Sequence, residues 1–436
     1  MNKRILNLAI PNIISNLSVP LLGIVDLALM GYKGSLQDMG AIALGGMIFN
    51  FIYWLWGFLR MGTTGFTAQS WGRRDLPAVV MHLSKALLVA LASSLLLIIL
   101  QTPIARLSFW VVEGSAEVER LAQVYFFIRI WAAPATISLY ALTGWFVGMQ
   151  NTKTPMVITI VINLLNIAFN MLFVFGFGMR SEGVAWGTVL AQYSGLLLAL
   201  FFLLRHYGKL KKYVTLKGIL QLRAFFNLNI HLFIRTLLLI LTLSYFTIAS
   251  ARFGDTILAV NTLLLQFFTI FSYFLDGFAY SAEALTGKFI GSNNRKGLQQ
   301  MLRIIFRWTA GLSLLFSLIY LFGHNLLLHI LTNKTAVIDA AAPYLTWIIF
   351  IPLTTFPAFV WDGVFIGATA SKSMRNVMAI ATLCFFFPTW FLLQHTMGNH
   401  ALWLAFLLMM SARSLFMTLI AKKVLLPPFQ EHYKRS

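Results

Sequence analysis

Acidic residues and cysteine are scarce in this sequence. Only 13 of its 436 residues are Asp or Glu, and charged residues of both signs make up 11% of the chain. Such a low share excludes an ordinary soluble domain, in which about a quarter of the residues are charged. Cys384 is the single cysteine, so the chain has neither a disulfide framework nor a cysteine-based metal site.

Sequence patterns typical of catalysis and nucleotide binding are also missing. No two histidines have metal-ligand spacing with nearby acids, and there is no Gly-rich phosphate loop and no Ser/His/Asp arrangement. We therefore expect no enzyme activity and no cofactor. Because no ATPase motif is present, any active transport has to use a proton or sodium gradient.

Apolar residues, by contrast, are abundant: 59% of the chain is hydrophobic, with 39 Phe and 12 Trp. A helix needs about 20 apolar residues to cross a bilayer, and runs of that length recur throughout the chain. We therefore predict an all-α polytopic membrane protein. Its 12 transmembrane helices are expected near residues 5–32, 41–66, 83–105, 121–148, 155–178, 184–204, 225–251, 256–280, 303–330, 343–368, 376–396 and 400–421.

The basic residues alternate with the predicted helices and indicate the topology. The larger set falls on one side of the membrane, at residues 3–4, 73–74, 153, 205–223, 288–307, 372–375 and 422–435. By the positive-inside rule this side is cytoplasmic. We expect a multi-pass protein of the cell (plasma or inner) membrane with both termini in the cytoplasm. The net charge of +20 then attracts anionic lipids rather than nucleic acid.

The two halves of the chain are similar to each other at an offset of 219 residues. The segment Gly144-Trp-Phe-Val-Gly148 corresponds to Gly363-Val-Phe-Ile-Gly367, and Gly72 corresponds to Gly291. Several matches at one offset, each at the same place in the order of the helices, indicate a duplicated unit. A parallel repeat of this kind is typical of transporters that work by alternating access.

The repeat predicts two pseudo-symmetric lobes of six helices each. We expect an N-lobe at 1–206, a basic cytoplasmic linker at 207–223, and a C-lobe with a short cytoplasmic tail at 224–436. Pro11 and Pro20 lie in the first helix, where each removes a backbone hydrogen bond and permits a bend.

One carboxylate, Asp26, lies inside the first predicted helix. An ionisable side chain in a span costs a few kcal/mol or more and by default marks a pathway or a proton relay. The fifth helix adds a polar stripe of Asn163, Asn166 and Asn170, and the sixth adds Thr188. These groups can hydrogen-bond a protonated Asp26 or help to hold a sodium ion. The alternatives are contact of Asp26 with headgroup water and hydrogen bonding of the asparagines between helices.

The C-lobe has its own candidate acids. Asp276 and Glu283 lie seven residues apart on one face of the eighth helix. Asp362 immediately precedes Gly363-Val-Phe-Ile-Gly367; we call this segment the second Gly motif and Gly144-Trp-Phe-Val-Gly148 the first. Arg235 in the seventh helix is a candidate counter-ion. Salt bridges between helices are an alternative role for these acids, and Glu283 lies close enough to the cytoplasmic end to be solvated. An intramembrane lipid enzyme would need clustered acids, and Asp276 and Glu283 lack a metal-binding motif.

Five segments around these residues resemble the MATE (multidrug and toxic compound extrusion) family, in its DinF-like branch. They are residues 9–26, Leu59-Arg-Met-Gly-Thr-Thr-Gly-Phe-Thr-Ala-Gln69, Gly148-Met-Gln-Asn-Thr-Lys-Thr-Pro155, residues 276–287 and residues 362–367. The resemblance covers nearly the whole chain. It implies a V-shaped pair of six-helix bundles, a monomer, that exports amphipathic and often cationic drugs or metabolites in exchange for protons or sodium.

The resemblance also implies roles for individual residues. In DinF-like relatives a helix 1 Asp, a helix 5 Asn-x-x-x-Asp pair and a helix 6 Thr form the coupling cluster, and a helix 1 proline allows bending. Asp26, Asn166, Thr188 and Pro11 match these positions. Asn170 stands where the second Asp would be, so Asp26 is expected to be the main coupling carboxylate and the only acid of the cluster.

Two alternatives stay open within the resemblance. Asp362 matches a helix 10 Asp that is implicated in cation binding in other branches, so the C-lobe is a rival coupling site. A lipid-linked precursor flippase of the same superfamily would favour a more cationic cavity, for which Arg60, Arg129 and Arg235 are candidates.

Overall fold

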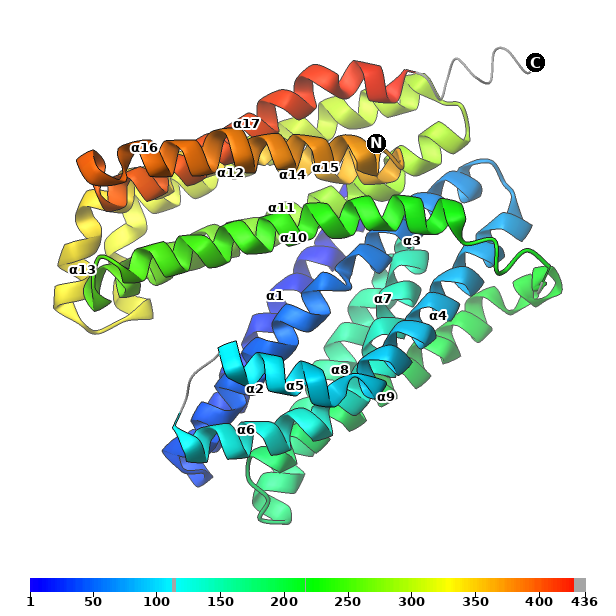
Figure 1. Cartoon of the computed structure of the whole chain (residues 1–436). Coiled ribbons are helices and arrows are strands. Elements are labelled where there is room, and N and C mark those ends of the chain that lie inside the picture. Colours follow the sequence, from blue (N-terminus) through cyan, green and yellow to red (C-terminus); the bar gives the residue numbers. More distant parts are fainter. Residues whose placement is uncertain (112–114, 216, 427–436) are drawn as a thin grey trace. The chain divides into compact units, whose positions relative to one another are not determined.

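The computed structural model describes residues 1–111, 115–215 and 217–426 (Figure 1). All regular structure in these ranges is helical. The α-helices are α1 (Asn2–Lys33), α2 (Leu36–Leu55), α3 (Gly57–Gly72), α4 (Leu76–Ile99), α5 (Gln101–Val111), α6 (Ala116–Arg129), α7 (Ala133–Gly148), α8 (Lys153–Met171), α9 (Ser181–Tyr207), α10 (Arg223–Ala251), α11 (Asp255–Gly291), α12 (Arg295–Leu331), α13 (Thr335–Ala341), α14 (Leu345–Gly367), α15 (Ser371–Ile380), α16 (Phe387–Met397) and α17 (Asn399–Leu425).

Short segments of tighter or wider helix join some of these. They are η1 (Ile130–Ala132), η3 (Gly208–Tyr213) and η4 (Ala342–Tyr344), which are 3-10 helices, and η2 (Leu172–Gly176) and η5 (Ala381–Phe386), which are π-helices. Residues 427–436 of the predicted cytoplasmic tail lie outside the described residues.

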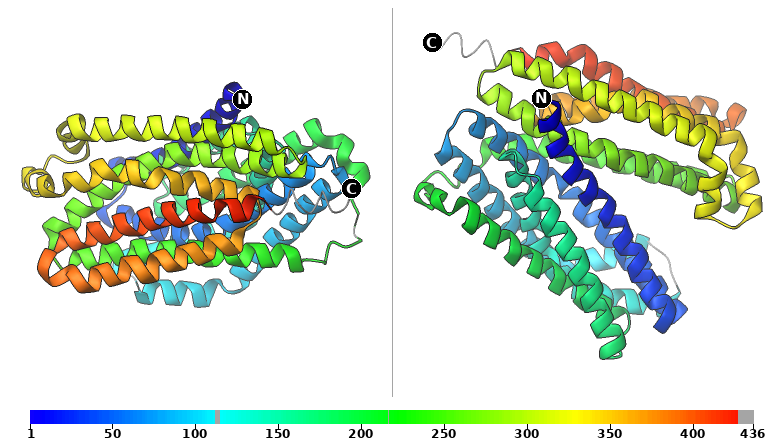
Figure 2. Two further views of the ribbon diagram at one scale, coloured as in Figure 1. Left: turned by 90° about the horizontal axis from the view of Figure 1, so that it is seen from above. Right: turned by 180° about the vertical axis from the view of Figure 1, so that it is seen from behind.

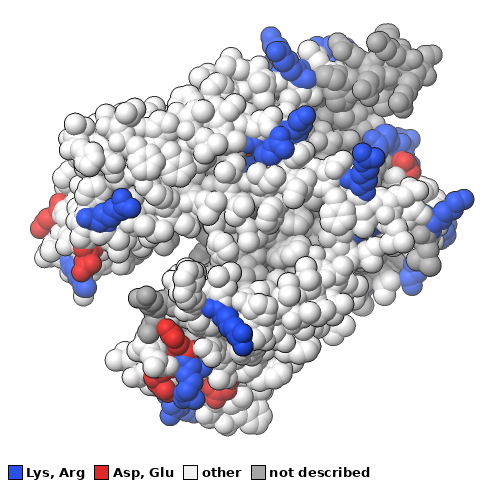
Figure 3. All heavy atoms as spheres, in the orientation of Figure 1, with Lys and Arg blue, Asp and Glu red and all other residues white. Residues whose placement is uncertain are grey.

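The lengths and compositions of the helices confirm an all-α polytopic membrane protein. Among the described residues, 11 helical segments are long and apolar enough to cross a membrane, and α1, with 32 residues, is long enough to be a twelfth. On the face shown in Figure 3, broad uncharged surfaces cover the helices, and most of the Lys, Arg, Asp and Glu side chains gather at the helix ends.

Several of the predicted helices are interrupted, and three of these lie in the first half of the chain. The second is divided at Trp56 into α2 and α3, and the fourth is divided by η1 just before Pro134. The third ends at Ile99, and α5 follows with Pro103 in its first turn. A proline has no N–H for the carbonyl four residues earlier, which accounts for the breaks before Pro103 and Pro134. The runs of apolar residues continue through all three interruptions.

The chain folds into two compact units. One comprises Ile14–Phe225, and the other comprises Met1–Ile13 together with the chain from Phe226 onward. We call them the N-terminal and the C-terminal unit. The helix α1 is continuous through Ile13 and Ile14 and is drawn in dark blue in Figure 2; its first turns therefore belong to the C-terminal unit.

Each unit has an aromatic-rich core. In the N-terminal unit, Phe49 of α2 and Phe126 of α6 are fully buried and stacked, with ring centroids 5.1 Å apart. In the C-terminal unit, Phe246 of α10 meets Trp403 of α17 edge to face at 4.9 Å. Such aromatic pairs contribute about 0.5–1.5 kcal/mol of stability beyond what the burial of their apolar surface contributes.

The first Gly motif lies where α7 crosses α3 in the N-terminal unit. A Cβ on Gly144 would overlap with the backbone of Arg60, and one on Gly148 would overlap with Thr67 and press against the carbonyl oxygen of Thr64. Glycines thus let the two backbones come into direct contact, as small residues do in membrane helix pairs generally.

The second Gly motif makes the equivalent crossing of α14 over α11 in the C-terminal unit. A Cβ on Gly363 would overlap with the backbone of Ala279, and one on Gly367 would overlap with the carbonyl oxygen of Glu283 and with Thr286. Every residue in this crossing lies 219 positions after its counterpart in the first. The sequence repeat is therefore a repeat of one helix crossing.

The repeat extends to the turns that follow these helices. Arg74 and Asn293 adopt positive φ angles of 62° and 52°, and Gln150 and Thr369 adopt 64° and 57°. Each pair is again related by 219 residues. The left-handed conformation closes the carboxyl end of a helix, so both units end these helices in the same way.

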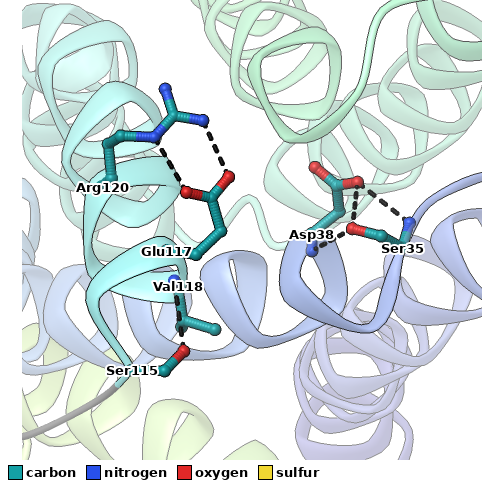
Figure 4. A network of polar contacts seen from close by, with 6 residues as sticks. All are labelled: Ser35, Asp38, Ser115, Glu117, Val118 and Arg120. Carbon is teal, nitrogen blue, oxygen red and sulfur yellow. Dashed lines mark hydrogen bonds and ion pairs between the residues drawn. The ribbon is translucent and has the colours of Figure 1, made fainter.

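Side-chain caps fix helix starts in the N-terminal unit (Figure 4). Ser35 Oγ accepts a hydrogen bond from the Asp38 N–H at 3.2 Å, and Asp38 Oδ2 accepts one from the Ser35 N–H at 2.9 Å, which is a complete capping box for α2. Ser115 caps α6, where Glu117 and Arg120 form an exposed ion pair at 2.8 Å.

The crossing predicts opposite effects for two Gly→Ala substitutions in helices. Gly144→Ala places a methyl group against the Arg60 backbone and should lower the free energy of unfolding by about 1–3 kcal/mol, as overpacking does. Gly311→Ala in α12 meets no atom within 4 Å and should raise stability by roughly 0.5–1 kcal/mol through helix propensity. SDS titration of the purified protein in mixed micelles measures both, and equal stabilities would contradict the crossing.

Candidate functional site

Asp26 lies on α1 within the N-terminal unit, and only 8% of its surface is exposed. Its Oδ1 accepts a hydrogen bond from Asn170 Nδ2 of α8 at 2.7 Å. The amide of Asn170 is fully buried, so this bond lies in a low-dielectric environment, where hydrogen bonds to a charged group are strong. The structure thus brings together the predicted carboxylate and the residue that departs from the family pattern.

A chain of hydrogen bonds continues from Asn170 across to α9. Asn170 Nδ2 also donates to Asn166 Oδ1 at 2.8 Å, Asn166 Nδ2 donates to Thr188 Oγ1 at 3.0 Å, and the Thr188 hydroxyl donates to the Val184 carbonyl at 2.9 Å. We call Asp26, Asn166, Asn170 and Thr188 the Asp26 cluster. Asn170 Oδ1 is a buried acceptor that has no hydrogen-bond partner among the described residues.

Gly187 of α9 makes room for this cluster. A Cβ at this position would collide with Asn170 Oδ1, so α8 and α9 approach each other closely at the level of Asn170. Gly187 was not predicted from the sequence, because a glycine in a membrane helix carries no signal of the side chain that it faces.

Asn163 and the two prolines of α1 lie outside the cluster. Asn163 Nδ2 donates to the carbonyl and hydroxyl oxygens of Ser18 at 3.2 and 3.0 Å, which ties α8 to an earlier turn of α1. Pro11 is buried and Pro20 is exposed, and α1 stays helical through both. The predicted stripe of three asparagines is therefore divided between two polar contacts.

Arg129 of α6 is a cationic side chain that acts electrostatically on Asp26 of the cluster. Its guanidinium donates to the Tyr125 hydroxyl and lies over the rings of Phe49 and Tyr125, 5.2 and 5.5 Å from their centroids. It is within electrostatic range of Asp26. Aromatic faces stabilise a partly desolvated guanidinium, so Arg129 supplies positive charge to this part of the N-terminal unit.

Asp362 of α14 has a different environment, in the C-terminal unit. Its Oδ2 accepts from Arg235 of α10 and from Arg413 of α17, the latter at 2.8 Å. We call these three residues the Asp362 cluster. Arg235 and Asp362 were both candidates from the sequence, whereas Arg413 was missed. It follows directly on a stretch without charges at 376–412 and interrupts an apolar helix, which was the available signal.

Asp276 and Glu283 both lie on α11. Asp276 is half-buried and acts on Arg413 electrostatically. Glu283 is fully buried, so the alternative that it is solvated near the cytoplasmic end is wrong. Gly367 lets α14 pass directly over the backbone of Glu283. Over the described ranges, no group of three His, Cys, Asp or Glu residues could hold a metal ion.

The Asp362 cluster generates a prediction for stability. Asp362→Leu leaves two guanidiniums in a buried position without their carboxylate and should lower the free energy of unfolding by about 3–5 kcal/mol. The control is Glu117→Gln, which removes the exposed ion pair with Arg120 and should change stability little. SDS titration in mixed micelles measures both, and a small loss for Asp362→Leu would show that the arginines do not depend on it.

Known proteins provide a comparison for this geometry. The MatE family model matches residues 11–172 and 232–391. DNA damage-inducible protein F of Escherichia coli (strain K12) is 36% identical over 432 residues, which cover 97% of this chain and 92% of that protein. A probable multidrug resistance protein NorM of Thermotoga maritima is 24% identical over 356 residues, covering 78% of this chain and 74% of the relative.

The fold is also found in solved structures. A transporter of the MOP superfamily from Pyrococcus furiosus superposes with a TM-score of 0.86 at 18% identity, over 98% of this chain and 96% of that one. The family match and the E. coli relative confirm the resemblance to the DinF-like branch. The chain belongs to the MATE family, whose members are membrane transporters and not enzymes.

Proposed function

We propose that the protein is a secondary active antiporter. It exports amphipathic, often cationic drugs or metabolites in exchange for protons by alternating access, and Asp26 is its main coupling carboxylate. The relatives named as multidrug resistance proteins support export, since they belong to the same family. The observation that carries the assignment to Asp26 is the hydrogen-bond chain from Asp26 through Asn170 and Asn166 to Thr188.

The contacts of Asp26 suit a group that gains and loses a proton. The hydrogen bond that Asp26 receives comes from the neutral amide of Asn170, which has a carbonyl oxygen as well as an NH2 group. The NH2 group donates to the carboxylate, and after rotation of the amide the buried Oδ1, which has no hydrogen-bond partner among the described residues, can accept from the carboxylic acid. Asn170 can thus satisfy both protonation states of Asp26.

Asp362 of the C-terminal unit is a weaker coupling candidate than Asp26. Asp362 is held by two guanidiniums, which carry a permanent positive charge. A substrate cation or an exchanged ion would have to displace them. We therefore place coupling in the N-terminal unit.

Protons suit the Asp26 cluster better than sodium does. A sodium ion needs several free oxygen ligands, but Asn166 Oδ1 and Thr188 Oγ1 already accept hydrogen bonds within the chain. Asp26 is the single acid of the Asp26 cluster, and the positive charge of Arg129 acts on the same site and disfavours a bound cation. One pH unit across the membrane then supplies about 1.4 kcal/mol per proton.

The remaining parts of the proposal follow from the family and from the charge pattern. We propose a monomer in the plasma or inner membrane, with cytoplasmic termini and with anionic lipids along the basic side. Its partners are small amphipathic substrates, and it needs no cofactor other than an ion gradient.

Asp26→Asn tests the coupling role. The variant should fold and still bind a cationic dye, because Asn keeps a hydrogen-bond acceptor for Asn170, but it cannot exchange a proton. Dye export driven by an imposed pH gradient in proteoliposomes should fall to the rate of protein-free liposomes. Asp255→Asn, at the exposed first turn of α11, is the control and should transport normally. Undiminished coupled export by Asp26→Asn would refute the proposal.

Asn170→Asp tests whether the departure from the family pattern sets the ion. A second carboxylate beside Asp26 creates a pair that is stabilised by a shared proton or a bound cation. We therefore expect a sodium gradient to drive dye export in this variant and to be ineffective in the parent protein. Asn163→Asp is the matched control, since Asn163 contacts Ser18 rather than the cluster. The same sodium response in all three proteins would exclude the role of Asn170.

A further inference from the structure

The Asp362 cluster contains more hydrogen-bond donors than its carboxylate can use. Each guanidinium has five N–H groups in a planar fork, and both arginines direct one Nη2–H to the same oxygen, Asp362 Oδ2. The other bond from Arg413 goes from Nη1 to the thioether of Met410 at 3.1 Å, and a thioether is a weak acceptor.

Two of the unused donors are buried, one on each arginine. Arg235 Nε and Arg413 Nε have no hydrogen-bond partner in the part of the chain that the structure describes, and neither has Asp362 Oδ1. Side-chain exposure is 10% for Arg235, 4% for Arg413 and 11% for Asp362. Leaving charged donors unsatisfied costs more than leaving neutral ones, so the cluster is incomplete as a purely internal ion pair.

The missing partner has a definite chemistry. Arginine binds carboxylate and phosphate groups through two parallel N–H···O bonds, whereas Asp362 offers one oxygen to two guanidiniums. A free oxyanion has two or more oxygens and is not attached to α14, so it can bridge both forks. Asp276 acts on Arg413 electrostatically but accepts no hydrogen bond from the two Nε–H groups.

We propose that Arg235 and Arg413 form a binding site for the acidic head group of an amphiphile, a carboxylate or a phosphate, next to Asp362. This inference rests on the proposed function in treating the ligand as a substrate. The Nε–H groups are covered in this conformation, so the ligand has to reach them in another state of the alternating-access cycle. The protein then exports acidic or zwitterionic amphiphiles in addition to cations.

A matched pair of dyes tests the site. A rhodamine with a free carboxylate and its methyl ester differ only in the acidic group, and fluorescence anisotropy measures the binding of each to the purified protein in nanodiscs. We expect the acid to bind at least tenfold more tightly than the ester, and this ratio to fall tenfold or more in Arg413→Gln. A parent protein that does not prefer the acid, or a ratio that Arg413→Gln leaves unchanged, would overturn the site.

Two further variants keep the test conclusive. Arg375→Gln is the control, because Arg375 of the same unit contacts Asn376 and His231 and should keep the parent ratio. Arg413→Lys keeps the charge but not the planar fork, so it should give an intermediate ratio and replaces Arg413→Gln if that variant does not fold. A parent-like ratio in Arg413→Lys would show that charge alone, without the fork, selects the acid.

A competition assay separates the two sources of the oxyanion. Farnesyl phosphate should displace the acidic dye if the site accepts a lipid phosphate, with farnesol as the matched control; if it fails to compete, the ligand is a carboxylate amphiphile. The proposed function can fail separately from the site. Transport of the ester driven by a pH gradient, without selectivity for the acid, would support proton-coupled export alone, whereas arginine-dependent binding without transport would support the site alone.

Discussion

The close crossing of two glycine-marked helices is the constraint on which the rest of each unit depends. Backbone contact at Gly144 and Gly148, and at Gly363 and Gly367, fixes both the distance and the rotation of α7 on α3 and of α14 on α11. A side chain at any of these positions would separate the helices. Because the same crossing occurs twice, its glycines are retained in both units, whereas the residues whose backbones they touch differ: Arg60 and Thr64 correspond to Ala279 and Glu283.

The two polar clusters use buried charge in opposite ways. Asp26 is surrounded by neutral amides and a hydroxyl, whose hydrogen bonds can be rearranged at low cost when a proton arrives. Asp362 is paired with permanent cations, so its surroundings change only if a helix or a ligand moves. In the proposals made above, the N-terminal unit therefore responds to pH and the C-terminal unit responds to the charge of the ligand.

The sequence was sufficient for the helices but not for their contacts. Apolar runs located the membrane spans because a helix needs a certain length to cross the bilayer. The same runs did not predict the breaks at Trp56 and Leu100, because the hydropathy of a residue does not depend on whether its backbone is hydrogen-bonded. The stripe of asparagines was predicted from its spacing, yet Asn163 faces Ser18 while Asn170 faces Asp26. The hydrogen-bond partner of a polar residue depends on the neighbouring helix. The close contact between Gly187 of α9 and Asn170 of α8 therefore cannot be predicted from the sequence of either helix alone.

The division of α1 between the units has a mechanical consequence. The chain passes from one unit to the other twice, within α1 at Ile13 and Ile14 and again at Phe225 and Phe226. Because α1 is one continuous helix, a bend in it near this boundary would move Asp26, which lies roughly 20 Å further along the helix at 1.5 Å per residue. Pro11, two residues before the boundary, and Pro20, between the boundary and Asp26, both lack a backbone N–H, so α1 bends most easily at these two positions.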